Sequence, residues 1–517
     1  MPAAFGAVPF DWAALSPMLV VSVGALLGTL VEAFVPRASR YVVQLALSVV
    51  TLLAALVALV VWAEPAPGGR TVGGSITIDG PALFMQGTLL VFGLLGVLLI
   101  SERFGGEGPD AFTAQGATTP GSPSEVAATR AGFVTSEVFP LTLFAVLGML
   151  MFVASSDLIT MFVALEVLSL PLYIMTGLAR RRRLLSQEGA LKYFLLGAFS
   201  SAFYLFGAAL LYGFAGSTDL AAIASSISVG SATMEVLLLP GVLLVLVGLL
   251  FKVGAVPFHS WTPDVYQGAP TPVTGFMAAA TKLAAFGAIL RFVYVGVASS
   301  RWDWQIGVAA IAALTMVVGA VVAVSQTDIK RLLAYSSIAH AGFILVGVLA
   351  FDVTAISGVM FYLLSYGLAT LAAFGVIGMV RQGASEATHI SQWSGLGRSH
   401  PVVAGVFSLL LLAFAGIPLT SGFTAKFAVF APAVSHGGTT GVVLVVIGVL
   451  MSAITAYVYF RLLVLMWFRK PADDVVVLVP SVATTVAVTV GAIATVLLGV
   501  APGLLLEMAD QAAKFVL

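Results

Sequence analysis

Long runs of apolar residues, each about 20 residues long, recur from one end of the chain to the other, with charged and small polar residues gathered between them. A helix of about 20 apolar residues crosses the roughly 30 Å hydrocarbon layer of a bilayer. The runs are continuous rather than alternating, which excludes a β-barrel. The pattern therefore predicts an all-α polytopic membrane protein with about 14 transmembrane helices, near 13–35, 41–63, 80–101, 137–154, 156–178, 188–214, 235–258, 272–296, 303–324, 329–350, 353–380, 401–432, 440–468 and 478–506.

Two of these helices carry a proline late in the apolar run, followed by small or polar residues: VGAVPFHSW at 253–261 and FAGIPLTSGF at 414–423. Proline removes a backbone hydrogen bond and clashes with the preceding turn, so both helices are expected to unwind there. They are the seventh and the twelfth helix, and because they lie five apart they cross the membrane in opposite directions. Paired broken helices of opposite direction are typical of an inverted repeat, here helices 4–8 and helices 9–13 with discontinuous helices 7 and 12.

The basic residues between the helices predict the orientation. The odd-numbered loops, counted from the first helix, hold fourteen Arg and Lys residues, whereas the even-numbered loops and the two ends hold three. The positive-inside rule places the odd loops in the cytoplasm and both termini outside. The composition agrees with many membrane spans, because 60% of the residues are hydrophobic and only 9% are charged.

These patterns divide the chain into four parts. Residues 1–136 hold three N-terminal transmembrane helices and a cytoplasmic segment, 101–132, which is rich in Gly, Pro, Ser and Thr and predicts a flexible loop. The first repeat (helices 4–8) covers 137–296, the second, inverted repeat (helices 9–13) covers 303–470, and helix 14 lies in 478–517.

The sequence offers no means of binding a cofactor. It has no cysteine, which excludes disulfides, iron–sulfur clusters and thiolate-bound metals. The five histidines are not spaced as metal ligands, and no Gly-rich phosphate loop is present. We therefore expect no cofactor in this chain. Zero formal net charge gives no reason to expect nucleic acid as a partner.

Six basic side chains fall inside predicted helices: Lys192, Lys252, Lys282, Arg291, Lys426 and Arg461. A cation in hydrocarbon costs several kcal/mol. Arg291 and Arg461 lie toward helix ends and are expected to snorkel to the interface. Lys192, near the start of helix six, either snorkels too or joins a proton pathway. Lys252, Lys282 and Lys426 lie too deep for snorkelling.

The deep lysines suggest proton transfer. Glu166 is mid-helix, and an ion pair with Lys252 about 4 Å apart gains roughly 4 kcal/mol at an effective dielectric near 20. Desolvation opposes that gain, so a buried lysine balanced between the two effects can exchange its proton. One static ion pair would explain one lysine, but three deep lysines cannot all be neutralised by one glutamate. The hypothesis is a proton path, which His259 and His340 could extend.

Two stretches of the chain carry a family resemblance. LLFKVGAVPFHSWTPDVYQGAPTPVTGFMAAATKLAAF and DIKRLLAYSSIAHAGF closely resemble the characteristic segments of the antiporter-like subunits of respiratory complex I, and the likeness covers about 137–470. The resemblance implies a proton-translocating membrane subunit of NADH-quinone oxidoreductase in a bacterial inner (plasma) membrane. Its partners would be neighbouring antiporter-like and small membrane subunits. NADH, FMN, the Fe–S clusters and the quinone would bind elsewhere in the parent complex.

The resemblance also implies roles for matching residues. Glu166 is similar to the helix-five glutamate of the family and Lys252 to the helix-seven lysine that pairs with it. Lys282 matches the helix-eight residue that links two half-channels, and Lys426 stands at the helix-twelve exit position. Sister subunits tend to carry an acid at this exit position, so the lysine favours one particular subunit. The long 101–132 loop departs from the family pattern.

Three other functions are alternatives. A subunit of a multisubunit Na⁺(K⁺)/H⁺ antiporter shares the fold and most of these residues, although Lys426 speaks against it. A self-sufficient secondary transporter would need a polar substrate site at the membrane midplane, and the sequence offers none beyond the lysines and one glutamate. A purely structural membrane scaffold would not need deep charges.

Overall fold

The computed structural model describes residues 10–62, 69–103, 110–131, 134–230, 234–383 and 385–516. In these ranges, twelve helical segments are long and apolar enough to span a membrane. Two more complete the expected fourteen, namely α5 (Val138–Ala154) and the broken pair α17 (Pro401–Ala415) and α18 (Ser421–His436). The prediction of an all-α polytopic membrane protein is confirmed.

The twelve long segments begin and end close to the predicted boundaries. They are α1 (Trp12–Phe34), α2 (Arg37–Val61), α3 (Gly80–Ile100), α6 (Leu158–Thr176), α7 (Arg183–Ala215), α9 (Glu235–Val253), α11 to α12 (Thr271–Phe276 and Lys282–Arg291), α13 (Arg301–Val324), α14 (Ile329–Val348), α15 (Val353–Met379), α19 (Gly438–Phe468) and α20 (Val482–Val500).

Shorter elements join these helices. They are α4 (Pro123–Arg130), α8 (Leu220–Val229), α10 (Trp261–Gly268), α16 (Leu396–Ser399), α21 (Gly503–Ala512), the hairpin β1 (Arg70–Thr71) and β2 (Ile76–Thr77), and the sheet β4 (Ser385–Glu386), β3 (Val380–Gln382), β5 (Val475–Val477). Both sheets are antiparallel.

Aspartates begin many of the helices. The side chain of each accepts a hydrogen bond from a backbone N–H of the first turn, which satisfies a donor that has no partner within the helix. Six helices begin in this way, α1, α3, α6, α8, α14 and α15, at Asp11, Asp79, Asp157, Asp219, Asp328 and Asp352.

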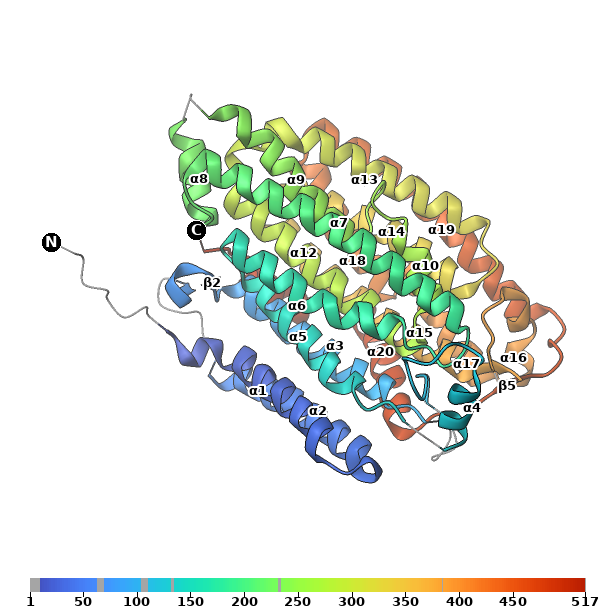
Figure 1. Ribbon diagram of the computed structural model, residues 1–517. Helices are drawn as coiled ribbons and strands as arrows, with labels where there is room; N and C mark the ends of the chain where they lie inside the picture. The colour runs from blue at the N-terminus through green and yellow to red at the C-terminus, as the bar shows by residue number, and fades with distance from the viewer. Residues whose placement is uncertain are drawn as a thin grey trace.

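The helices lie side by side as a slab, with the α1–α2 pair at one edge and the second repeat at the other (Figure 1). α12 lies in the interior, where it packs against α3, α5, α9 and α15, and all ten of its residues are buried. α14 packs against α10, α13, α15, α18 and α19. The eighth and tenth spanning segments therefore form the centre of the bundle.

Helices seven and twelve are broken, as predicted, but glycine rather than proline ends each first half. Gly254 and Gly416 have left-handed φ values of 76° and 81°. Past each glycine, the next backbone N–H reaches back five residues, from Ala255 to Leu250 (3.0 Å) and from Ile417 to Leu412 (3.1 Å). This is the Schellman ending, which glycine permits because it has no Cβ. The matching endings agree with the two repeats.

Two features of the surroundings were not expected from the sequence. Within segment 101–132, whose flexibility stays a prediction, the carbonyl oxygens of Gly116 (3.1 Å) and Thr118 (3.0 Å) accept from the guanidinium of Arg183, and α4 follows. Arg291 does not snorkel. Its side chain is fully buried and donates to both carboxylate oxygens of Asp79, at 3.0 and 2.7 Å, a partner too distant in sequence to be predicted.

Candidate functional site

Lys252 is the last but one residue of α9 and is buried beside the first helix break. Its ammonium lies over the rings of Tyr173 on α6 and Tyr193 on α7, at 5.3 and 5.2 Å from the ring centroids. A cation over an aromatic face within about 6 Å is attracted by the ring quadrupole. The two aromatic rings therefore lower the cost of holding this charge inside the bundle.

The ion pair predicted between Lys252 and Glu166 is absent from the ion pairs of the described residues. The carboxylate of Glu166 instead accepts a hydrogen bond from the hydroxyl of Ser201 on α7. Glu166 lies on α6, the same helix as Tyr173, whose ring contacts the Lys252 ammonium. The two groups are thus near each other in the bundle without forming an ion pair.

Lys282 lies in the interior of the bundle, directly after a π-helical turn (η2, Met277–Thr281) in the eighth spanning segment. Its ammonium donates to the carbonyl oxygen of Val253 at 3.3 Å and to that of Ser337 at 2.7 Å. Val253 is the last residue of α9, so its carbonyl is one that the helix itself leaves without a partner. The break in helix seven thereby holds the lysine of helix eight.

His340 lies near Lys426, because its ring packs on that of Phe414, whose carbonyl oxygen accepts from the Lys426 ammonium. Its Nδ1 lies 2.7 Å from the hydroxyl of Tyr362, and its ring packs on Tyr366, over which Lys282 also lies. Its Nε2 is buried with no hydrogen-bond partner among the described residues. Such a nitrogen is suited to a water molecule or a proton.

A cavity of about 10 Å³ separates His340 from the break in helix twelve, with Phe414, Ser421 and Ala425 among its lining residues. That volume is on the order of one water molecule. Polar groups line only part of it. A single water there would bridge the histidine and the second break.

Lys426 is buried on α18, five residues after that helix begins. Its ammonium donates to the carbonyl oxygens of Phe414 (3.3 Å) and Ala415 (2.9 Å), at the end of α17, and lies 4.9 Å from the ring centroid of Phe343. Like Lys282, it is held by carbonyls freed at a helix break and by an aromatic ring. None of the described ion pairs joins a carboxylate to any of the three deep lysines.

The remaining two predicted site residues lie apart. Lys192, whose side chain is 41% exposed, forms ion pairs with Glu188 and Asp264, each at 2.6 Å. Asp264 on α10 also pairs with Arg331. His259 is half-buried at the first break, and no described hydrogen bond or ring contact links it to the lysines. The structure therefore brings together Glu166, Lys252, Lys282, His340 and Lys426.

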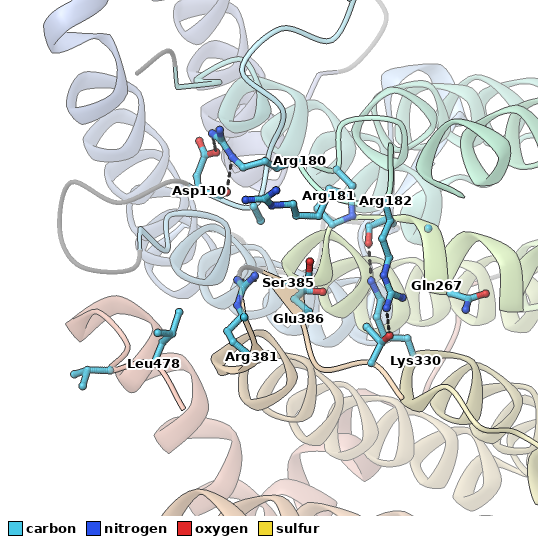
Figure 2. Close-up of a pocket in the computed structure, with 18 residues that line it drawn as sticks. Asp110, Arg180, Arg181, Arg182, Gln267, Lys330, Arg381, Ser385, Glu386 and Leu478 are labelled. Carbon is cyan, nitrogen blue, oxygen red and sulfur yellow. Dashed lines mark hydrogen bonds and ion pairs between the residues drawn. The ribbon is translucent and has the colours of Figure 1, made fainter. Parts of the chain in front are cut away.

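A pocket of about 470 Å³ opens on the face formed by the odd-numbered loops between the spanning helices. We call it the arginine-lined pocket. Its charged residues are Asp110, Arg180, Arg181, Arg182, Lys330, Arg381 and Glu386. Figure 2 shows Arg180 directed at Asp110 and Arg181 reaching into the space above Glu386. Burial raises the pKa of Asp110 in spite of its ion pair with Arg180.

Polar groups lead from this pocket toward the centre. The hydroxyl of Thr271 donates to Glu386 (2.6 Å), and the ammonium of Lys330 donates to the carbonyl of Ala269 (2.7 Å) and to Thr271 (3.3 Å). Lys330 and Ser337 are seven residues apart on α14 and so share one helix face. The backbone carbonyl oxygen of Ser337 accepts from the Lys282 ammonium. Sequence reasoning assigned Lys330 to a loop and missed this connection.

The described residues contain no group of three or more His, Cys, Asp or Glu side chains that could hold a metal ion. The arrangement that they do contain is a row of exchangeable protons carried by lysine, histidine, tyrosine and serine. Such a row can pass protons, and it contains no redox group.

A protein-family profile described as "NADH:quinone oxidoreductase/Mrp antiporter, TM" matches residues 155–455, more than half of the chain. The chain belongs to this family. The matched range contains all of the residues that the structure brings together. The family likeness proposed from the sequence is confirmed.

Similar proteins of known name agree with this family assignment. The chain is 55% identical over 525 residues to "NADH-quinone oxidoreductase subunit N" of Rhodococcus opacus (strain B4), which covers 98% of this chain and 96% of that protein. It is 54% identical over 514 residues to the protein of the same name from Salinispora arenicola (strain CNS-205), with 98% of each covered. The preference that Lys426 gave for one subunit of the family agrees with these relatives.

Solved structures share the fold. A chain of respiratory complex I from Thermus thermophilus with bound aureothin has 32% identity and a TM-score of 0.75, covering 95% of this chain and 98% of that one. A chain of the Mrp complex from Dietzia sp. DQ12-45-1b has a TM-score of 0.77 at 22% identity, covering 98% and 97%. The second likeness concerns the fold alone.

Proposed function

We propose that this chain is a proton-translocating membrane subunit of NADH-quinone oxidoreductase. The observation that carries the proposal is the arrangement of Lys252, Lys282 and Lys426 in the interior of a membrane bundle, where two helix breaks hold Lys282 and Lys426 and the ring of His340 packs between Tyr366 and Phe414. Relatives more than 50% identical bear the name of that complex's subunit N. A static scaffold would not need three buried ammonium groups without contacting carboxylates.

Protons enter from the cytoplasm through the arginine-lined pocket, between helices seven and eight. They pass Lys330 and Ser337 to Lys282, continue through His340 and the small cavity, and leave by way of Lys426. Glu166 and Lys252 form the pair whose approach or separation alters the proton affinity of the central lysine. Support comes from the polar groups on α14 and from the break carbonyl of Val253, which places Lys282 next to Lys252.

Electron transfer belongs to other subunits. NADH, FMN, the iron–sulfur clusters and the quinone bind elsewhere in the complex, since a chain without cysteine cannot ligate a cluster through thiolates. The partners of this chain are the neighbouring antiporter-like and small membrane subunits, and its place is the bacterial plasma membrane. The positive-inside rule supports cytoplasmic odd-numbered loops and external termini.

Purification of the tagged, full-length chain from its native membrane tests the proposal. We expect flavin and iron–sulfur subunits to co-purify, and the purified complex to pump protons when NADH reduces a quinone. Co-purification with cation-antiporter subunits, and no NADH oxidation, would contradict it and favour the multisubunit Na⁺(K⁺)/H⁺ antiporter.

A further inference from the structure

Two sites for the Lys252 ammonium lie on the paired helices α6 and α7. Glu166 and Tyr173 are seven residues apart on α6, and Tyr193 and Ser201 are eight apart on α7. Residues spaced in this way share a helix face about 10 to 12 Å apart along the axis. Glu166 accepts from Ser201 at one level, and Tyr173 packs edge-on against Tyr193 at the other. A carboxylate site and an aromatic site therefore stand about two turns apart.

The ammonium of Lys252 occupies the aromatic site. It lies 5.3 Å from the ring centroid of Tyr173 and 5.2 Å from that of Tyr193, whereas the described ion pairs do not join it to Glu166. Two ring faces attract one cation here, in a water-poor interior where such attraction is strongest. The lysine is thus stabilised as a cation away from its carboxylate.

The neighbouring side chains fix these rings. Tyr193 stacks on Trp261, with centroids 4.6 Å apart and ring planes 8° from parallel. The indole of Trp261 donates to the carbonyl of Phe251 at 3.0 Å, which ties the ring stack to the break in helix seven. Gly197 lies between Tyr193 and Ser201, and a Cβ there would clash with the Tyr173 hydroxyl. The aromatic site is rigid and is built from three helices.

One polar atom of this site is left without a partner. The hydroxyl of Tyr193 is fully buried and has no hydrogen-bond partner among the described residues. A buried phenol normally finds a partner. An ammonium or a water molecule that moves between the two sites would supply one for part of the time.

We propose that Tyr173 and Tyr193 form an aromatic seat for the Lys252 ammonium, so that this lysine alternates between the seat and Glu166. The inference rests on the proposed function and adds positioning residues to it. When Lys252 occupies the seat, Glu166 keeps only Ser201 as a partner, and the break carbonyl of Val253 stays with Lys282. When Lys252 moves to Glu166, the seat empties. The four-carbon stem of lysine is flexible, which allows its ammonium to change partners.

Ring substitutions in the assembled complex test the seat. Tyr173→Phe and Tyr193→Phe keep the ring faces, so NADH-driven proton pumping should exceed that of the corresponding leucine variants. Tyr173→Leu and Tyr193→Leu remove the ring faces and should slow pumping by roughly tenfold. Phe199→Leu is the matched control, because Phe199 is an exposed aromatic residue of the same helix α7.

Mono-, di- and trifluorinated phenylalanine at position 173 separates the seat from a packing role. Each added fluorine weakens the attraction of the ring face for a cation with little change in shape, so pumping should fall stepwise. A flat fluorine series, or wild-type pumping in the double leucine variant, would overturn the seat. Lys252→Ala is measured beside the fluorinated variants. Wild-type pumping by Lys252→Ala would overturn the proposed function itself. Loss of pumping by Lys252→Ala, together with equal pumping by all fluorinated variants, would overturn the seat alone.

Discussion

The two broken helices end in the same way and hold their lysines differently. In helix seven, Lys252 precedes the break, and the free carbonyl of Val253 accepts from Lys282 of another helix. In helix twelve, Lys426 follows the break and donates to Phe414 and Ala415 of its own first half. The carboxylate of Glu166 lies on α6, which also supplies the Tyr173 ring over which Lys252 lies, whereas none of the described ion pairs joins Lys426 to a carboxylate.

This difference indicates different tasks. The first break contacts the central lysine, Lys282, and its own lysine, Lys252, lies near the carboxylate of Glu166. At the second break, the lysine is bound by carbonyl oxygens of the same broken helix. Among the described residues, His340 and a cavity of about 10 Å³ connect this break to the centre of the bundle. We infer that the proton affinity at the first break depends on the neighbouring Glu166 and Lys282. We infer that the second break is the place where protons leave, through the single titratable group Lys426.

The largest effect is expected from Lys252→Ala. Removal of a proton-transferring group costs about 100-fold or more in rate, and Glu166 would keep no cationic neighbour. Coupled NADH–quinone turnover and proton pumping should both collapse in assembled complex that carries Lys252→Ala. Lys426→Ala should instead block proton release to the outer side, while proton uptake from the cytoplasmic side persists. Assembly is checked by the amount of complex in the membrane. Normal pumping by assembled Lys252→Ala would show that the first break has no such task.

Replacing the glycine at each break sharpens the comparison. Gly416→Ala places a Cβ 3.0 Å from Lys426 Cδ and 3.1 Å from its Nζ, whereas Gly254→Ala meets the Thr262 hydroxyl at 2.8 Å. Both variants carry the backbone strain of a left-handed alanine, about 1 to 2 kcal/mol. Gly416→Ala should therefore lower the pumping rate several-fold more than Gly254→Ala. Equal losses would mean that strain alone matters and that the position of Lys426 does not.

Exchanging the charge at the second break should cost less than deleting it. Lys426 donates to two carbonyl oxygens, which repel an ionised carboxylate but accept from a protonated one. Lys426→Glu should keep partial pumping, because the acid is still titratable at that place. Pumping rates of Lys426→Glu and Lys426→Ala are compared in the same membranes. A glutamate variant as inactive as the alanine variant would exclude simple titration at this site.

The smallest effect is expected from Lys192→Ala. Lys192 is 41% exposed, and exposed ion pairs contribute about 0 to 1 kcal/mol. Asp264 would keep Arg331 as a partner at 2.5 Å. Turnover should stay within about twofold of wild type. A loss comparable to that of Lys252→Ala would instead place Lys192 on the proton path.

The apolar pattern predicted most of the fold because burial in lipid requires continuous hydrophobic runs. It located fourteen spanning segments, both breaks and the three deep lysines. It could not predict contacts across the chain, such as Arg291 with Asp79 or Lys282 with Ser337. The attribution of the breaks to proline was wrong in detail, since glycines two or three residues earlier end the helices.

The partners of the deep lysines were the main omission. Charge arithmetic favours a carboxylate partner for a buried cation, and therefore predicted contact between Lys252 and Glu166, but it named no partner for Lys282 or Lys426. The structure supplies ring faces and freed carbonyls, which have no formal charge and so leave no trace in a charge count. The sequence did carry a signal for the ring faces. Tyr173 lies seven residues from Glu166 on α6, and Tyr193 lies eight residues from Ser201 on α7, so each tyrosine shares a helix face with a polar residue.

The central claim is that the two breaks are joined through Lys282 and His340 into one path. A structure of the assembled complex with resolved waters tests it most directly. We expect an ordered water between His340 and the break in helix twelve, and a water chain from the arginine-lined pocket past Lys330 to Lys282, with Lys426 connected to the outer side. The claim would be contradicted by a dry gap between His340 and Lys426, by a Lys426 side chain that faces lipid, or by its connection through water to the cytoplasm.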